Sequence, residues 1–113
     1  MLTIDALKSF GANTDDALAR CMGNEAFYFR LIGKVLEDKN FNLLEESILA
    51  KDFDKAFEAA HTLKGVLGNL SLTPIYDPVC EITELLRTKS DVDYAPYISS
   101  IADKKAELLE LMK

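Results

Sequence analysis

The sequence has few of the residues from which metal sites and disulfide frameworks are built. It contains one histidine and two cysteines among 113 residues, and Cys21 and Cys80 lie far apart in the chain. This set indicates neither a disulfide framework nor a zinc site, whose ligands recur at close spacing. The two cysteines are typical of small buried side chains in a reducing compartment.

Long apolar runs are also absent. No stretch approaches the roughly 18 apolar residues that cross a bilayer, and the first ten residues, MLTIDALKSF, lack the basic start and apolar stretch of a secretion signal. We therefore expect a cytoplasmic protein. Acidic residues outnumber basic ones by 19 to 13, and the net charge of −6 argues against binding to nucleic acid or to an anionic membrane.

The chain is long enough for one hydrophobic core. Hydrophobic residues make up 49% of the sequence and charged residues 28%, a balance typical of a folded globular domain. No internal repeat, low-complexity tract or linker-like segment divides it, so we expect residues 1–113 to form a single domain. Met1 and a helical pattern that reaches Lys113 favour a freestanding protein, although a domain cut from a longer protein would look the same.

Apolar residues recur at helical spacing along the chain, and no segment alternates with a period of two. The patterns predict helices that begin near Thr3, Thr14, Asn24, Phe41, Phe53, Thr73 and Tyr94. Short connections join the later helices, which favours antiparallel packing. We therefore predict an all-α fold, an antiparallel four-helix bundle with short additional N-terminal helices that cover one end.

Residues that cap helices place some of the helix ends. Thr14 is expected to be an N-cap, with Met22 facing the core near the end of the same helix. Thr73 and Pro74 are expected to be the N-cap and the first residue of a later helix. Pro78 either kinks that helix or marks the start of its regular part, and the sequence leaves both interpretations open.

The only histidine lies in the segment FDKAFEAAHTLKGVLGNLSL, residues 53–72. At about 100° per residue, one arc of this helix is apolar and must face a core. The apolar arc consists of Phe53, Ala56, Phe57, Ala60, Leu63, Leu67 and Leu70. The adjoining arc carries residues at i, i+3, i+4 and i+7, which are His61, Lys64, Gly65 and Gly68. The histidine is therefore expected at the edge of the buried face, beside a cation and two residues without side chains.

The two glycines on this arc need a reason, because glycine inside a helix costs about 0.5–1 kcal/mol relative to alanine. One explanation is that Gly65 and Gly68 clear the surface for a partner protein. The other is that they let a neighbouring helix of the same protein pack closely, with His61 as an incidental boundary residue. The spacing alone allows both.

The chemistry open to this segment is limited. No glycine-rich loop between a strand and a helix is present to hold a nucleotide, which argues against a kinase or an ATPase. Glu45, Glu46 and Glu58 are best interpreted as parts of solvated helix faces, and a small bundle offers little support for a hydrolase triad. A neutral imidazole is a nucleophile at neutral pH, since its ordinary pKa is about 6.5. Phosphoryl transfer requires mainly positioning and charge neutralisation, and Lys64, one turn from His61, supplies a cation.

The segment AHTLKGVLGNLSL, residues 60–72, resembles the signature of histidine-containing phosphotransfer (HPt) domains, approximately A-H-x-L-K-G followed by small residues and N-L-G. The matching residues are His61, Leu63, Lys64, Gly65, Asn69 and Leu70. Ser71 stands where the family commonly has glycine, and Val66 and Leu67 are bulkier than the small pair often seen. The flanking segments LAKDFDKAFEAA and VCEITELL also resemble the family, so we expect the resemblance to cover essentially the whole chain.

The resemblance implies a role in a two-component phosphorelay. His61 would accept a phosphoryl group from a receiver-domain aspartate and pass it to another receiver. Lys64 would stabilise the phosphate, and Gly65 would allow close approach. A polar side chain from the next helix often holds the histidine or its phosphate in this family, and without a gap that residue would be Thr83 or Arg87.

The resemblance also implies the partners, which would be receiver domains of response regulators or of hybrid histidine kinases. The chain would be a phosphocarrier without ATPase or autokinase activity, and it would need no cofactor, since Mg²⁺ would belong to the receiver. Two other interpretations use the same bundle. One is a non-phosphorylated helical adaptor that binds a response regulator, and the other is the phosphoacceptor domain of a larger histidine kinase.

Overall fold

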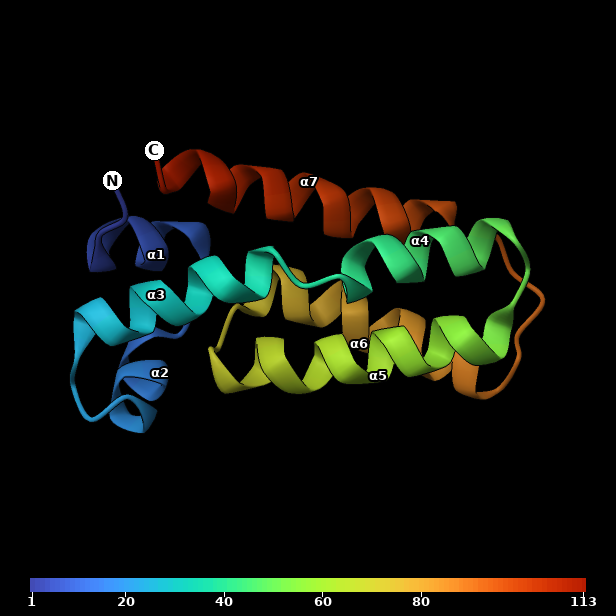
Figure 1. The fold of residues 1–113 in the computed structure, drawn as a ribbon, viewed down its shortest axis with the longest axis horizontal. Coiled ribbons are helices and arrows are strands. Elements are labelled where there is room, and N and C mark those ends of the chain that lie inside the picture. Colours follow the sequence, from blue (N-terminus) through green and yellow to red (C-terminus); the bar gives the residue numbers. More distant parts are fainter.

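The structure, a computed structural model, describes residues 1–113, and every regular element in it is a helix (Figure 1). The helices are α1 (Ile4–Phe10), α2 (Thr14–Arg20), α3 (Glu25–Leu36), α4 (Asn40–Leu49), α5 (Phe53–Asn69), α6 (Thr73–Arg87) and α7 (Ala95–Leu111). The molecule is elongated and measures 41 × 24 × 20 Å. None of the helices combines the length and the apolar character that a membrane span requires.

Helices α4 to α7 form a bundle in which successive helices run in opposite directions (Figure 1). α5 packs against both α4 and α6, and α6 also packs against α7. α1, α2 and α3, which we call the N-terminal layer (residues 1–36), gather at one end of the molecule, and α3 leads almost in line into α4 (Figure 1). The predicted all-α bundle with additional N-terminal helices at one end is confirmed.

A single cluster of 25 buried hydrophobic residues runs from Leu2 to Leu108 and includes members of all seven helices. The apolar arc predicted on α5 faces this cluster. Its buried members are Ala56, Ala60, Leu63, Leu67 and Leu70. Phe53 and Phe57, at the edge of the arc, are half-buried. The periodicity of α5 therefore identifies both the side that faces the core and the side that faces solvent.

Side-chain caps begin several helices where the sequence predicts them. Asn24 accepts a hydrogen bond from the Phe27 amide at 3.0 Å, and Asp52 accepts one from the Lys55 amide at 3.2 Å. Gly11 ends α1 with a φ of 114°, a backbone conformation that glycine adopts without a steric penalty. These caps satisfy amides and carbonyls that have no partner inside their own helix.

Two predictions about α2 are wrong. Asn13, and not Thr14, is the N-cap, because the Asn13 side chain accepts from the Asp16 amide at 3.2 Å. Met22 is 94% exposed and does not face the core. The reason is that α2 ends at Arg20, and the chain then reverses through Met22 and Gly23, which both have positive φ.

The start of α6 also differs from the prediction. The helix is preceded by Leu72 as its N-cap, so Thr73 is the first helical residue and Pro74 the second. Pro78 lies inside α6, which runs unbroken from Thr73 to Arg87, so the regular part does not begin at Pro78. Proline lacks an amide hydrogen, and the carbonyl of Pro74 therefore receives no hydrogen bond from position 78.

Candidate functional site

α5 places His61 on the flank of the bundle. The helix extends for 17 residues beyond its cap at Asp52. Ala60 and Leu63, on the apolar arc of the same helix, are completely buried, whereas the His61 side chain is exposed. The imidazole ring therefore lies where the helical periodicity predicts it, at the edge of the buried face and open to solvent.

An open depression surrounds the histidine on this flank, and we call it the His61 depression. It is lined by Arg20, His61, Lys64, Gly65, Gly68, Asn69 and Tyr76. The four residues of the predicted arc thus come together in one place. Two of the lining residues are cations and none is a carboxylate, although the whole chain carries a net charge of −6. The depression is therefore suited to a negatively charged group.

The two glycines of the arc have different surroundings. A Cβ atom added at Gly65 would meet no other atom within 4 Å, so the surface there is open. A Cβ atom added at Gly68 would lie 3.0 Å from Cε1 of Tyr76, which packs over it from α6. Both explanations allowed by the sequence therefore apply, one to each position. Gly65 leaves room for another molecule, whereas Gly68 lets Tyr76 of the same protein pack closely against α5.

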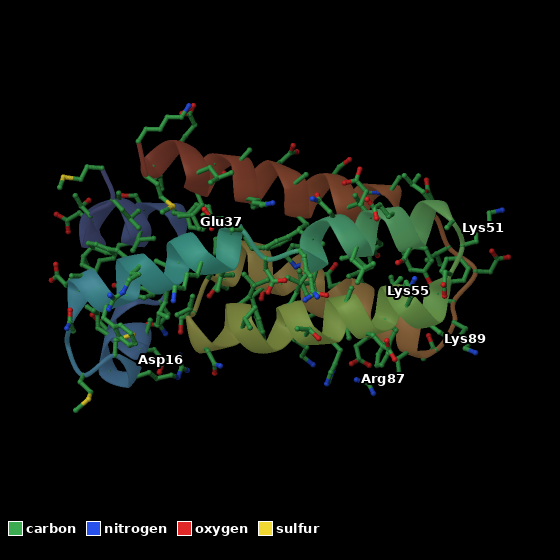
Figure 2. All side chains as sticks on the ribbon, viewed as in Figure 1. Asp16, Glu37, Lys51, Lys55, Arg87 and Lys89 are labelled. Atoms are coloured by element: carbon green, nitrogen blue, oxygen red, sulfur yellow. The ribbon has the colours of Figure 1, made fainter.

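The His61 ring stacks on Phe57, one turn earlier on α5. The ring centroids are 5.8 Å apart and the planes differ by 23°. Arg87 from α6 approaches the same phenyl ring, with its Cζ atom 5.1 Å from the Phe57 centroid, and its Nε atom lies 3.3 Å from Oε2 of Glu84. Figure 2 shows Arg87 on the outer side of α5 and α6. Arg87 therefore lies close to the site, but its cation faces Phe57.

Thr83 does not take part in the site, so the suggestion that it holds the histidine is wrong. Its side chain is completely buried, and its hydroxyl donates to the carbonyl oxygen of Val79 at 2.6 Å. A residue at this position of α6 faces the core and has its only hydroxyl hydrogen engaged within its own helix.

Arg20 is the site residue that the sequence did not reveal. Its Nη1 atom donates to the carbonyl oxygens of Gly68 (3.4 Å) and Asn69 (2.8 Å) and to the hydroxyl of Ser71 (3.0 Å). Its Nη2 atom lies 2.6 Å from Oδ2 of Asp16 in an ion pair. The i, i+4 spacing of Asp16 and Arg20 is visible in the sequence, but the contacts with α5 span about fifty residues and have no local signal.

Two further hydrogen bonds from the N-terminal layer reach carbonyl groups just after the end of α5. The Tyr28 hydroxyl donates to the carbonyl of Leu70 at 2.8 Å, and the Asn13 amide donates to the carbonyl of Ser71 at 3.0 Å. When the Arg20 hydrogen bonds are included, four consecutive carbonyls, those of residues 68–71, accept hydrogen bonds from the N-terminal layer. The last turn of α5 contains no basic residue of its own, so these donors come from elsewhere in the chain.

Ser71 departs from the family signature at a position where the backbone has a φ of 53°. This left-handed conformation favours glycine, which agrees with the glycine commonly found there. The serine hydroxyl accepts from Arg20 and donates to Oδ2 of Asp16 at 3.1 Å. These two hydrogen bonds offset part of the cost of the conformation, and both come from the N-terminal layer.

Two tyrosines near the end of α5 have raised pKa values. Burial is the main reason that the pKa of Tyr28 rises from 10.0 to about 12, with the neighbouring Cys21 adding to the rise and Arg20 opposing it. A hydrogen bond with the Cys80 thiol, one turn along α6, raises the pKa of Tyr76. The Tyr28 phenol therefore stays protonated into alkaline solution, and its hydroxyl remains a donor to Leu70 there.

No group of three or more histidine, cysteine, aspartate or glutamate side chains is arranged so that it would hold a metal ion. Cys21 and Cys80 are both free. The chemical groups of the His61 depression are thus one imidazole, two cations, an amide and a phenol.

Comparison with known protein families finds one family model that matches the chain. The family model described as Hpt domain matches residues 37–112, about two thirds of the chain. The match begins just before α4 and includes the whole bundle, so the expectation that the resemblance covers essentially the whole chain is too wide, because the N-terminal layer lies outside it. No curated protein and no solved structure matches the chain. Members of this family are phosphocarriers that act with receiver domains in two-component signalling, and the chain belongs to the Hpt domain family.

Proposed function

We propose that the protein carries phosphoryl groups in a two-component phosphorelay, with His61 as the phosphoacceptor. In this role His61 accepts a phosphoryl group from the aspartyl phosphate of one receiver domain and passes it to the aspartate of another. The observation that supports this most directly is the exposed imidazole in a depression that has two cations and no carboxylate, in a chain of the Hpt domain family.

The transfer step uses the lone pair of one imidazole nitrogen. This nitrogen attacks phosphorus, and a bond between nitrogen and phosphorus forms as the bond between phosphorus and the aspartyl oxygen breaks. The aspartate leaves as a carboxylate with the bonding electron pair, and the proton on the second imidazole nitrogen passes to water. The same steps in reverse deliver the phosphoryl group to the aspartate of the next receiver.

Lys64 and Gly65 have separate tasks in this proposal. The transferred group has its negative charge on three peripheral oxygens, and the Lys64 ammonium, one turn from His61, neutralises part of that charge. Gly65 keeps the surface beside His61 free of side-chain atoms, so the receiver brings its aspartate into line. Phe57 supports the imidazole by stacking, which limits the rotation of the ring.

The chain itself supplies no metal or nucleotide chemistry in this proposal. Mg²⁺ stays with the aspartyl phosphate on the receiver, and the protein acts as a carrier without ATPase or autokinase activity. The partners are receiver domains of response regulators or of hybrid histidine kinases, and we place the exchange in the cytoplasm.

The test is transfer of radioactive phosphate from phosphorylated receiver domains in the presence of Mg²⁺. We expect the protein to acquire label that is labile in acid and stable in alkali, as phosphohistidine is, and we expect His61→Gln to acquire none while its helical circular dichroism is unchanged. Binding of a receiver without transfer would instead identify a non-phosphorylated adaptor. Label gained only from ATP and a kinase catalytic domain would identify the phosphoacceptor domain of a larger histidine kinase.

A further inference from the structure

We propose that Arg20 is a specificity-determining residue for receiver docking, and that its guanidinium pairs with a carboxylate on the surface of the receiver. This inference rests on the proposed phosphotransfer function. It adds a contact made by the N-terminal layer, which lies outside the residues that match the Hpt domain family.

The position of Arg20 supports docking and excludes direct contact with the phosphoryl group. The guanidinium lines the same depression as His61 and Lys64. Its hydrogen bonds, however, are to the carbonyls of Gly68 and Asn69, which follow His61 by seven and eight residues. At about 1.5 Å per residue along a helix, this end of the depression is on the order of 10 Å from the histidine.

That separation lies well inside a protein interface. A standard interface covers about 800 Å² on each partner, which corresponds to a patch on the order of 30 Å across. A receiver that places its aspartyl phosphate at His61 therefore also covers Arg20. The guanidinium meets the surface of the receiver around the phosphorylated residue, and the phosphoryl group itself meets Lys64.

The guanidinium is held in place but keeps donors free. Nη1 and Nη2 make the hydrogen bonds to α5, Ser71 and Asp16, whereas Nε makes none, and the side chain is 45% exposed. An arginine has five N–H donors in a rigid planar fork. Because the fork is already ordered by Asp16 and Ser71, binding a carboxylate costs little additional side-chain entropy.

The charge around Arg20 favours an acidic partner group. Arg20 and Lys64 are the two cations of the His61 depression, and no carboxylate lines it. Asp16, which pairs with Arg20, lines a neighbouring depression together with Ser71 and Thr73 and is absent from this one. Asp16 already neutralises part of the charge of Arg20 through Nη2, so the partner carboxylate would bind the N–H donors that Asp16 leaves free, on the side of the guanidinium that faces the His61 depression.

The experiment compares variants of Arg20 by their affinity for the receiver domain that transfers label to His61. We expect Arg20→Gln to raise the Kd about tenfold, which corresponds to about 1.4 kcal/mol, and to weaken the dependence of the Kd on salt concentration. The rate constant of transfer at saturating receiver should change less than about twofold. Arg20→Lys retains the charge but loses the planar fork, so we expect its Kd to lie between that of the wild type and that of Arg20→Gln.

A structural control is needed, because Arg20 also caps the end of α5. Tyr28→Phe removes another hydrogen bond to the same end of α5, but the Tyr28 hydroxyl is buried and cannot meet a partner. We expect this variant to lower the melting temperature and to leave the Kd unchanged. Arg20→Gln and Arg20→Lys should both lower the melting temperature as well. A loss of affinity in Arg20→Gln that Tyr28→Phe does not share would therefore come from docking and not from lost stability.

Three outcomes would overturn the inference. An unchanged Kd for Arg20→Gln, or equal weakening by Arg20→Gln, Arg20→Lys and Tyr28→Phe in proportion to their loss of stability, would show that Arg20 is only a helix cap. Both results leave the proposed phosphotransfer intact, because the wild-type protein still transfers label. If the wild-type protein neither binds nor accepts label from any receiver, the proposed function fails and this inference fails with it.

Discussion

The bundle of α4 to α7 and the N-terminal layer differ in what holds them in place. Three helices of the bundle are long, since α5 and α7 have 17 residues each and α6 has 15, and each of the three packs on its neighbours along an apolar stripe, whereas α4 has ten residues. α1 and α2 have only seven residues each. Isolated helices shorter than about 12 residues are marginal in water, so these two depend on caps and on packing against the rest of the protein.

The dependence also runs in the other direction. The end of α5 has no basic residue and no glycine cap, and carbonyls there accept hydrogen bonds from Arg20, Tyr28 and Asn13 of the N-terminal layer. The bundle contains the histidine, whereas the N-terminal layer completes the helix on which the histidine lies. Substitutions in the bundle should therefore change transfer, and substitutions in the N-terminal layer should mainly change stability, with the proposed docking residue Arg20 as the exception.

The largest effect is expected at Lys64, inside the bundle. Lys64→Ala removes the cation that lies one turn from His61 on α5, and loss of one stabilising charge at a developing anion costs on the order of 100-fold in rate. We expect the rate of transfer to fall by about that factor, with helical circular dichroism unchanged, as measured by single-turnover labelling. An unchanged rate would remove Lys64 from the proposed site.

The next largest effect is a loss of stability in alkaline solution, caused by Tyr28 of the N-terminal layer. The pKa of Tyr28 is about 12 in the folded protein and 10.0 ordinarily. Between these values the unfolded chain releases a proton that the folded chain keeps, so the free energy of unfolding falls as pH rises. This contribution is fully present below pH 10, and we expect about 2 kcal/mol of it to be lost by about pH 12.

The measurement is urea unfolding at several pH values, with Tyr28→Phe as the matched variant. Phenylalanine cannot ionise, so the difference between the wild type and Tyr28→Phe isolates this residue from lysines that titrate in the same range. Equal slopes against pH for the two proteins would show that the Tyr28 phenol ionises as readily in the folded protein as in the unfolded one.

Tyr28→Phe at neutral pH should separate the two regions most clearly. The substitution leaves the carbonyl of Leu70 without its donor inside the core, and an unsatisfied buried group costs about 1–3 kcal/mol. We expect a loss of stability in that range in chemical unfolding, together with an unchanged rate of transfer. A large loss of transfer in this variant would mean that the end of α5 controls the chemistry at His61.

Gly65→Gln should have the opposite effect to Tyr28→Phe, because it should weaken receiver docking without a loss of stability. No neighbouring atom opposes a side chain at Gly65, and replacing a glycine inside a helix stabilises it by about 0.5–1 kcal/mol. The new side chain would stand where the receiver docks. We expect affinity for the receiver to fall about tenfold while the melting temperature rises slightly, as measured by titration calorimetry and thermal unfolding.

The smallest effect is expected at Gly68. An alanine Cβ there would lie 3.0 Å from Tyr76, so the tyrosine ring must move slightly, and this cost opposes the gain from helix propensity. We expect Gly68→Ala to change stability by less than about 1 kcal/mol and to change affinity for the receiver less than Gly65→Gln does. If both variants weakened docking equally, Gly68 would also be part of the docking surface.

The sequence predicted most of the fold because the signals are local. Apolar residues at helical spacing identify each helix and its buried side, and capping residues such as Asn24 and Asp52 identify several helix starts. Its errors lie where a tertiary contact or a turn decides the outcome. Met22 is exposed because the chain reverses after Arg20, and α6 begins at Thr73 with Leu72 as its N-cap.

The sequence by itself determined that His61, Lys64, Gly65 and Gly68 share one arc of a helix, because residues three and four positions apart are always neighbours on a helix. Only the tertiary structure decided which residues surround that arc. It placed Tyr76 over Gly68, turned Thr83 into the core, set Arg87 against Phe57 and brought Arg20 to the end of α5. These contacts join different helices, and helix spacing carries no information about which helix faces which.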